Sequence, residues 1–216
     1  MEAIFIRSKD HIIHTVKSKC IFEPKVWSKT FGRKLTQNVV EAKIVHTHLG
    51  TTLPLKTFAV TPLSQTVEFA GLHGYNERST LLVQTLTELE SQLEPSRVTR
   101  IDVCIDYANG IPKSIVRSLS KNREPFQWHS TTYYKTHKEL ENKDRSNAYM
   151  DIKIYNKAHQ AKLDHPLWRL EFVFKSKYLK GLSLRDLNLA IKKMEKTIKS
   201  VADITVKINP IIDLKR

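Results

Sequence analysis

Three short segments carry an acid, a base or a phenol at alternate positions. They are RIDVCID (100–106), DIKIY (151–155) and WRLEF (168–172). In a β-strand, alternate side chains point to the same face. Each segment therefore predicts a strand with one apolar face and one reactive face, and the reactive faces carry Asp102 and Asp106, Lys153 and Tyr155, and Arg169 and Glu171. If the three strands are neighbours in a sheet, these side chains converge.

Such a set of side chains is suited to chemistry on phosphate esters. Carboxylate oxygens are the ligands that Mg²⁺ or Mn²⁺ prefers. A metal held there would polarise a phosphate, and a tyrosine would attack it and become covalently attached. Alternation extends the tyrosine's face to Lys157, and nearby positive charge on Lys153 and Lys157 is expected to favour the phenolate. The alternative, an ordinary solvent-facing strand surface, stays open on spacing alone.

The composition points to a polyanionic partner. The chain has 216 residues, 40% apolar and 27% charged, which is enough to build a globular core. The formal net charge is +14. A charge of this size favours nucleic acid as the partner, with a generally basic surface as the alternative. No strongly basic amphipathic helix dominates the sequence, which disfavours a membrane surface.

The cysteines and the N-terminus predict a cytoplasmic protein. The two cysteines, Cys20 and Cys104, are far apart and form no CxxC pair, so no disulfide framework is expected. The segment MEAIFIRSKD lacks a signal-peptide pattern, and no apolar run approaches the length of a membrane span.

The elements that must position these residues can be read from periodicity and turn signals. Strands are predicted at 3–8, 11–18, 42–50, 65–71, 97–110 (ended by a turn), 126–135, within 149–160 and after Pro166, with polar loops or turns at 71–77 and 136–147. Helices are predicted at 79–93, 111–122 and 183–202, and the last has a clean apolar stripe that predicts core or interface packing. This mixture predicts an α+β fold with a largely antiparallel central sheet flanked by helices.

Three sequence blocks in the same order resemble the replication initiation factor family. The blocks are the strand–glycine–helix unit in TVEFAGLHG…LTELESQLEPSRV, the strand TRIDVCID, and the pair IYNK…WRLE, all between residues 65 and 181. The family comprises the rolling-circle Rep initiators of staphylococcal-type plasmids, with relatives in filamentous phages and in conjugative-element relaxases. The resemblance implies a non-HUH Rep nuclease-like fold and a single catalytic DNA-nicking domain over 1–216. Within it, 1–64 is a β-rich part of unassigned role, 65–181 is the Rep-like core and 182–216 is a C-terminal helix and tail.

The resemblance also implies a mechanism and roles for individual residues. Such proteins nick an origin through a tyrosine, which leaves a 5′-phosphotyrosine link and a 3′-OH primer. The nucleophile corresponds to Tyr155, and Glu171 and Asp102 look like ligands of Mg²⁺ or Mn²⁺. Asp106 matches the motif's second acid, either as a ligand or as a support for the site. Lys157 follows the tyrosine at the family's spacing, and Arg169 is expected to hold a phosphate or the nearby carboxylates.

The sequence departs from the family where origin recognition is concerned. Plasmid members are longer, the turn GLHGYNE lacks a cysteine or arginine after its second glycine, and TTYYKTHK replaces a Gly-Ser-Arg-like segment. Contacts with origin duplex and single strand are expected to depend on salt. The predicted DNA contacts are Arg100, Lys153, Lys135, Tyr134 and Arg145.

Several rival signals remain. His46 and His48 alternate on a likely strand face, as metal-binding histidines do in HUH nucleases, although a polar Thr47 separates them. Tyr133 and Tyr134 are alternative nucleophiles or stacking residues, and at most one of them can share a face with Tyr155. Trp128 and His129 are candidates for stacking on single-stranded DNA, with a core position as the alternative for Trp128.

The sequence thus predicts a metal-dependent DNA nickase that initiates rolling-circle replication. A host or accessory helicase and a possible homodimer are the other expected partners, and no membrane is involved. Two alternatives stay open: a conjugative relaxase with the same chemistry, and a non-catalytic basic DNA-binding protein on the same fold.

Overall fold

The structure is a computed structural model. It describes the backbone of strands within residues 3–70, namely 3–8, 20–31, 34–46, 51–61 and 64–70, and the whole of residues 97–141, 149–183 and 186–208. Contacts divide the chain into two compact units. Unit 1 is built mainly from Ile101–Lys180 and Asn188–Asn209, and unit 2 mainly from Glu2–Arg100.

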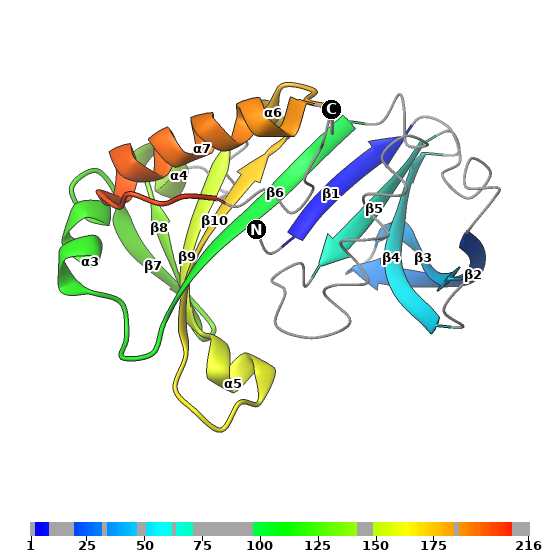
Figure 1. Cartoon of the computed structure of the whole chain (residues 1–216), viewed down its shortest axis with the longest axis horizontal. Helices are drawn as coiled ribbons and strands as arrows, with labels where there is room; N and C mark the ends of the chain where they lie inside the picture. The colour runs from blue at the N-terminus through cyan, green and yellow to red at the C-terminus, as the bar shows by residue number, and fades with distance from the viewer. Residues whose placement is uncertain are drawn as a thin grey trace. The chain divides into compact units, whose positions relative to one another are not determined.

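Unit 2 contains a sheet of long antiparallel strands (Figure 1). Its order is β2 (Cys20–Phe31), β3 (Lys34–His46), β4 (Thr51–Thr61), β5 (Ser64–Ala70) and β1 (Ala3–Ser8). The strands predicted at 3–8 and 65–71 are confirmed, and the one predicted at 42–50 forms the end of β3. The segments 11–18, 71–77 and 79–93 lie outside the described residues, as does His48.

Unit 1 is built on a five-stranded antiparallel sheet. Its order is β6 (Arg97–Tyr107), β10 (Trp168–Lys175), β9 (Met150–Asn156), β8 (Thr131–Lys135) and β7 (Glu124–Trp128). The predicted α+β class with an antiparallel sheet is confirmed. The three strands that carry the reactive segments, β6, β10 and β9, are consecutive neighbours in this sheet.

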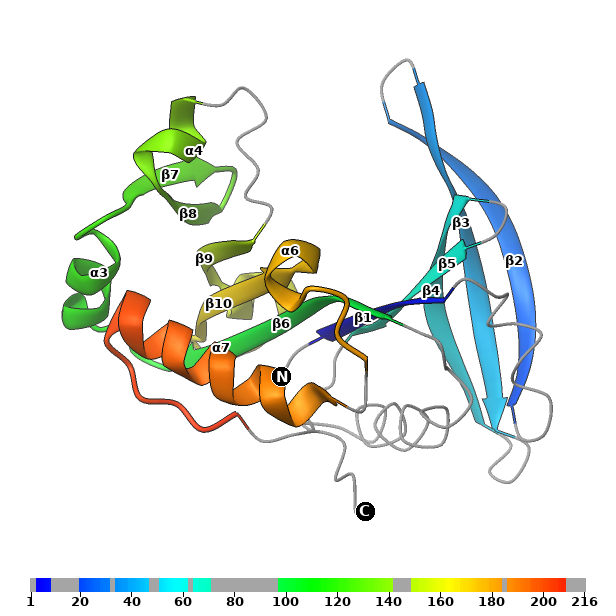
Figure 2. The same cartoon turned by 90° about the horizontal axis from the view of Figure 1, so that it is seen from above.

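Helix α7 (Leu187–Ala202) lies along the apolar face of this sheet (Figure 2). The faces of β6, β9 and β10 on that side are buried, and α7 buries the predicted stripe of Leu187, Ile191, Met194 and Ile198 against them. The helix begins at Leu187, whereas the prediction started it at Ser183. Burial of this much apolar surface is the main source of stability for unit 1.

The shorter helices are partly as predicted. Helix α3 (Lys113–Leu119) follows Pro112 and buries Ile115 and Leu119, as expected. Helix α4 (His137–Glu141) forms where a loop was predicted. Its start is a capping box, because the Glu139 carboxylate accepts a hydrogen bond of 3.0 Å from the backbone N–H of Thr136. Helices α5 (Lys157–Ala161) and α6 (Ser176–Leu179) are single turns that follow β9 and β10.

The prediction of one strand across 126–135 is wrong. The segment is a hairpin in which β7 and β8 are joined by His129 and Ser130. His129 has a φ of 50°, in the left-handed region that tight hairpin turns require. The turn contains neither glycine nor proline, so the strand-like alternation of side chains in the sequence continues across it and predicts a single strand.

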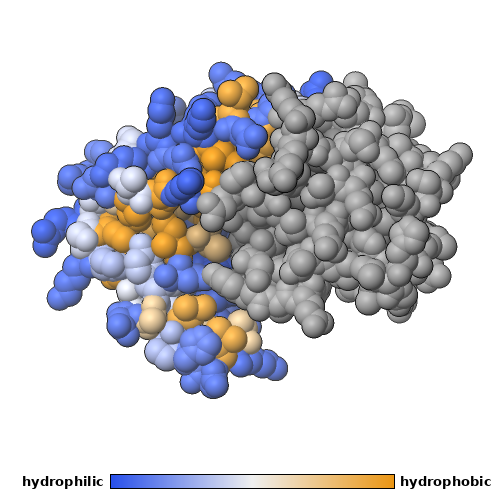
Figure 3. Space-filling model, viewed as in Figure 1, coloured by the Kyte–Doolittle hydropathy of each residue, from blue (hydrophilic) through white to orange (hydrophobic). Residues whose placement is uncertain are grey.

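Hydrophilic residues cover most of the rim of the described surface that Figure 3 shows, with apolar residues gathered between them. Within the described residues, no helix combines the length and the apolar character needed to cross a membrane.

Candidate active site

Strand pairing brings the predicted reactive residues onto one face. In the register between β9 and β10, Tyr155 lies opposite Arg169 and Lys153 lies opposite Glu171. Directly opposite residues in an antiparallel pair point to the same side of the sheet. Strand β6 adds Asp106, whose carboxylate contacts Arg169. We call this side of the unit 1 sheet the polar face, and it lies opposite the face that packs on α7.

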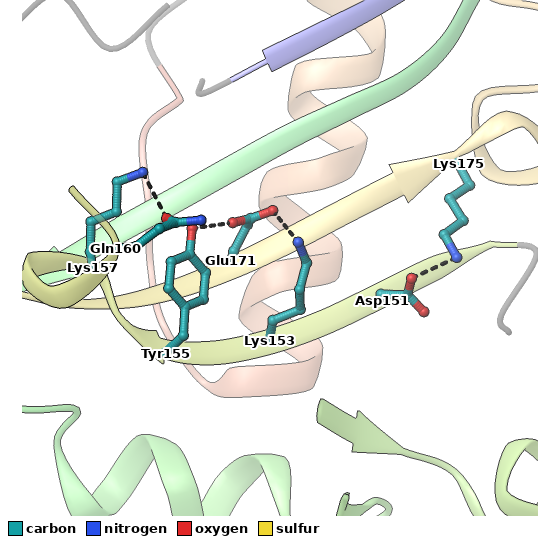
Figure 4. Close-up of polar contacts among 7 residues, drawn as sticks. All are labelled: Asp151, Lys153, Tyr155, Lys157, Gln160, Glu171 and Lys175. Atoms are coloured by element: carbon teal, nitrogen blue, oxygen red, sulfur yellow. Dashed lines mark hydrogen bonds and ion pairs between the residues drawn. The ribbon is translucent and has the colours of Figure 1, made fainter. Parts of the chain in front are cut away.

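Glu171 connects Tyr155 and Lys153 at the centre of the polar face (Figure 4). The Tyr155 hydroxyl donates a hydrogen bond of 2.6 Å to Oε2 of Glu171. The Lys153 ammonium donates one of 2.6 Å to Oε1 of the same carboxylate. Glu171 is only 4% exposed, so contacts such as those with Tyr155 and Lys153 must replace the solvation that water would provide to this carboxylate.

The environment of Tyr155 keeps its phenol protonated. Burial raises the pKa of Tyr155 far above its usual range, and the negative charge and hydrogen bond of Glu171 raise it further. Arg169 acts in the opposite direction through its charge and a hydrogen bond, without reversing the shift. The expectation that lysines favour the phenolate is therefore wrong. The ammonium of Lys153 donates its hydrogen bond to the Glu171 carboxylate and not to the phenol oxygen. A phenol in this state could act as a nucleophile only if a neighbouring group took its proton, and the Glu171 carboxylate already accepts its hydrogen bond.

Arg169 is held by Asp106 in a two-point contact. Nε and Nη2 of Arg169 each donate a hydrogen bond of 2.7 Å, one to each carboxylate oxygen of Asp106. The Arg169 residue is 1% exposed, which makes this a buried charge-assisted pair. Arg169 was predicted to hold either a phosphate or a nearby carboxylate, and the structure shows the contact with the carboxylate of Asp106. Asp106 supports Arg169 in this arrangement.

Lys157 does not share the strand face of Tyr155, because β9 ends before it. The side chain of Asn156 accepts a hydrogen bond of 3.0 Å from the backbone N–H of His159 and caps helix α5. Lys157 is the first residue of that helix, and its ammonium donates a hydrogen bond of 3.1 Å to Gln160 (Figure 4). The predicted continuation of the alternation to Lys157 is wrong for this reason.

The acids offer at most a small set of metal ligands. Among the side chains that the structure describes, no three or more of the His, Cys, Asp and Glu type are grouped to hold a metal ion. Both oxygens of Asp106 already accept hydrogen bonds from Arg169. Both oxygens of Glu171 also accept hydrogen bonds, from Lys153 and Tyr155, and Asp102 and Glu171 are each 4% exposed. Two carboxylates fit Mg²⁺, which usually takes one or two carboxylates and completes its coordination with substrate phosphate and water.

A second charged cluster lies further along the polar face. Asp151, on β9, accepts a hydrogen bond of 2.8 Å from Lys135 and makes an ion pair of 2.6 Å with Lys175. Burial acts to raise the pKa of Asp151, but the hydrogen bonds and charges of Lys135 and Lys175 outweigh it and hold this pKa below its usual range. Lys135 was predicted to contact DNA, and the structure shows it buried against Asp151.

The remaining predicted DNA contacts fall in different places. Tyr134 is 6% exposed and faces the core, so little of its ring is open to a ligand. Tyr133 pairs with Lys153 and lies on the polar face. Arg100 is half-buried in β6, and Arg145 lies outside the described residues. The hairpin register, which the sequence did not reveal, decides which tyrosine faces the site.

Comparison with known proteins gives one similar solved structure, a rolling circle replication initiator protein from Geobacillus stearothermophilus. The similarity covers 93% of this chain and 83% of that chain, with 12% sequence identity and a TM-score of 0.48. No protein-family model matches the chain, and no curated protein matches it.

Proposed function

We propose that this protein is a tyrosine transesterase that nicks and rejoins one DNA strand to initiate rolling-circle replication. The observation that carries the proposal is the hydrogen bond of 2.6 Å from the Tyr155 hydroxyl to Glu171, on a face that also presents Arg169. A nucleophile that is paired with a base, on a strand next to a cation, is the arrangement that covalent attack on a phosphodiester needs. The order of the three sequence blocks and the net charge of +14 support DNA as the substrate.

The proposed reaction exchanges one phosphodiester for another. The Tyr155 oxygen bonds to the phosphorus while its proton passes to Oε2 of Glu171, and the bond from phosphorus to the 3′ oxygen breaks. The 3′ oxygen takes up a proton and becomes the primer end, while the 5′ phosphate stays on Tyr155. Attack by a 3′-OH on the phosphotyrosine reverses these steps and rejoins the strand. No energy cofactor is consumed, because the number of phosphodiester bonds is unchanged.

Arg169 and Lys153 have different parts in this reaction. Arg169 lies opposite Tyr155, and this position supports a role for its guanidinium in stabilising the negative charge that would develop on the phosphate. Lys153 makes an ion pair of 2.6 Å with Oε1 of Glu171 and so holds the carboxylate beside the phenol, where it would accept the proton. Mg²⁺ or Mn²⁺, held by Asp102 and Glu171, would polarise the phosphate. Asp106 holds the Arg169 side chain in position.

The test is the formation of a covalent protein–DNA adduct on supercoiled DNA of the replicon that encodes the chain, with Mg²⁺ or Mn²⁺ present. Mass spectrometry should place the nucleotide on Tyr155, and Tyr155→Phe should form no adduct. Tyr178→Phe is the matched control, because the Tyr178 hydroxyl contacts Thr197 of α7, away from the polar face, and should be dispensable for the covalent step. Adduct formation by Tyr155→Phe would refute the proposal.

A conjugative relaxase would use the same site chemistry. The same assay separates the two functions when replication-origin DNA and transfer-origin DNA are offered side by side. A preference for the replication origin supports an initiator, and a preference for the transfer origin supports a relaxase. Retention of DNA binding with no adduct on either DNA would instead support the non-catalytic DNA-binding alternative.

A further inference from the structure

An exposed tryptophan lies in the same row of the sheet as the candidate nucleophile. Trp128 on β7 pairs with Thr131 on β8, and Thr131 pairs with Tyr155 on β9. Residues paired in this way point to the same side, so the indole of Trp128 is on the polar face. Two strand spacings separate the backbones of Trp128 and Tyr155, which amounts to about 10 Å.

The indole is exposed and held in position by other rings. Trp128 is 57% exposed. The ring of Phe126 stacks on it with centroids 6.4 Å apart and planes 29° apart. The His129 ring meets its edge, with centroids 5.2 Å apart. The indole is therefore an ordered aromatic surface that a ligand can reach with little cost in ordering.

The hairpin that carries Trp128 is fastened from its opposite side. Gln127 and Thr132 pair across the hairpin, and the Thr132 hydroxyl donates a hydrogen bond of 2.7 Å to the Gln127 side chain. The Gln127 amide donates one of 2.7 Å to the backbone carbonyl of His129. These contacts fix the turn without using the face on which Trp128 lies.

We propose that Trp128, supported by Phe126, is a stacking platform for an unpaired base of the DNA strand whose phosphate lies at Tyr155. The inference rests on the proposed function. Aromatic side chains bind single strands by stacking on base faces, largely independently of sequence. At the B-DNA rise of about 3.4 Å per nucleotide, about 10 Å corresponds to three stacked nucleotides, and to fewer in an extended strand.

The residues beside the platform and the nucleophile favour a nucleic acid as the occupant. Thr131 lies between Trp128 and Tyr155, and in the next row of the polar face Tyr133 pairs with both Phe126 and Lys153. This neighbouring row places an ammonium and a phenol alongside Trp128 and Tyr155, which suits a ligand with alternating phosphates and bases. A duplex hides its base faces in the stack, so the platform selects an unpaired strand.

The test uses tryptophan fluorescence in the Tyr155→Phe protein, which lacks the nucleophile, so that binding is measured without reaction. Oligo-dT of 12 nucleotides should quench the emission, and an abasic strand of the same length should bind more weakly without this quenching. Trp128→Phe should lose most of the quenching and keep most of the affinity. Trp128→Ala should bind oligo-dT about 5- to 150-fold more weakly, the loss of one stacked base.

Trp168→Phe is the matched control. Trp168 is 38% exposed and alternates with Arg169 on β10, so it points to the side opposite the polar face. Quenching should persist in this variant, and the melting temperatures of all variants should confirm that they are folded. Unchanged quenching in Trp128→Phe, or an equal loss of affinity for oligo-dT and the abasic strand in Trp128→Ala, would overturn the platform. Tighter binding of duplex than of oligo-dT by the Tyr155→Phe protein would do the same.

The result is separable from that of the adduct assay. If the wild-type protein forms no adduct but oligo-dT still quenches Trp128, the nickase proposal is refuted and the stacking platform is supported. An adduct on Tyr155 with no response of Trp128 refutes the platform alone.

Discussion

The hydroxyl of Tyr155 on β9 donates a hydrogen bond of 2.6 Å to Oε2 of Glu171 on β10. The two side chains come from adjacent antiparallel strands, and Lys153 occupies the other carboxylate oxygen. This contact places the phenolic proton on a direct path to a carboxylate. It also explains why the phenol is harder to ionise than a free tyrosine, since Glu171 adds to the effect of burial.

Glu171→Gln is expected to slow adduct formation about 10²- to 10⁴-fold at neutral pH, because the amide keeps the shape but cannot take the proton. Without the Glu171 charge the pKa of Tyr155 should fall, so part of the lost rate should return as the pH rises. Single-turnover adduct formation as a function of pH measures both effects. If extra Mg²⁺ restores the rate and extra hydroxide does not, Glu171 acts as a metal ligand and not as the proton acceptor.

Tyr155 is expected to make stability depend on pH in the alkaline range. Its pKa in the folded protein is raised above the value of about 10 for an unfolded tyrosine. The neutral phenol therefore stabilises the fold below pH 10, and this contribution is lost as the pH rises towards the folded pKa. The free energy of unfolding of the wild type, from urea titrations, should fall more steeply above pH 10 than that of Tyr155→Phe. Parallel pH profiles for the two proteins would contradict the raised pKa.

Asp106→Asn is expected to destabilise unit 1 by about 3–5 kcal/mol, because it removes the carboxylate charge that accepts two hydrogen bonds from the buried Arg169 guanidinium. Urea unfolding measures the change. Asp203→Asn is the matched control, since Asp203 pairs with Lys199 at 2.8 Å in an exposed position, where removal of a partner should change stability far less. Equal effects of the two substitutions would show that burial of Arg169 contributes nothing to the Asp106 pair.

Asp151→Asn is expected to flatten the acid limb of the stability profile. The pKa of Asp151 is held below its usual range in the folded protein, so its contribution is present above about pH 4 and is lost as the pH falls through the folded value. The wild type should therefore lose more stability between neutral and acid pH than the variant does. At neutral pH the variant should be less stable by about 2–4 kcal/mol, because Lys135 stays buried without its carboxylate partner. Thermal unfolding across this range checks both effects.

The strands of the candidate site could be predicted from the sequence because their alternation is regular. In β6, β9 and β10, apolar residues alternate with charged or phenolic ones, and the structure buries the apolar ones. The partners of each charged group could not be predicted, since they depend on the register between strands that are far apart in the chain. Lys153 reaches Glu171 and not the phenol only because it lies directly opposite that carboxylate.

The errors have local causes. The turn at His129 and Ser130 contains no glycine or proline, so the sequence predicts one strand where the structure has the β7–β8 hairpin. Without the register of this hairpin, the sequence does not show which face of the sheet Tyr133 and Tyr134 occupy. The capping box at Thr136 and Glu139 was a readable helix signal within a polar segment. Strand β9 ends at Asn156, whose side chain caps helix α5, so Lys157 belongs to the helix and not to the strand.

Tyr155 lies on β9, the middle strand of the unit 1 sheet, with hydrogen-bonded neighbours on both sides. Its backbone is held by hydrogen bonds to β10 on one side and β8 on the other, so it cannot move as the backbone of a loop residue can. In the proposed reaction the protein end of the phosphotyrosine bond therefore stays stationary from cleavage to rejoining. The DNA must therefore move relative to this fixed surface, so that a new 3′-OH reaches the phosphate attached to Tyr155.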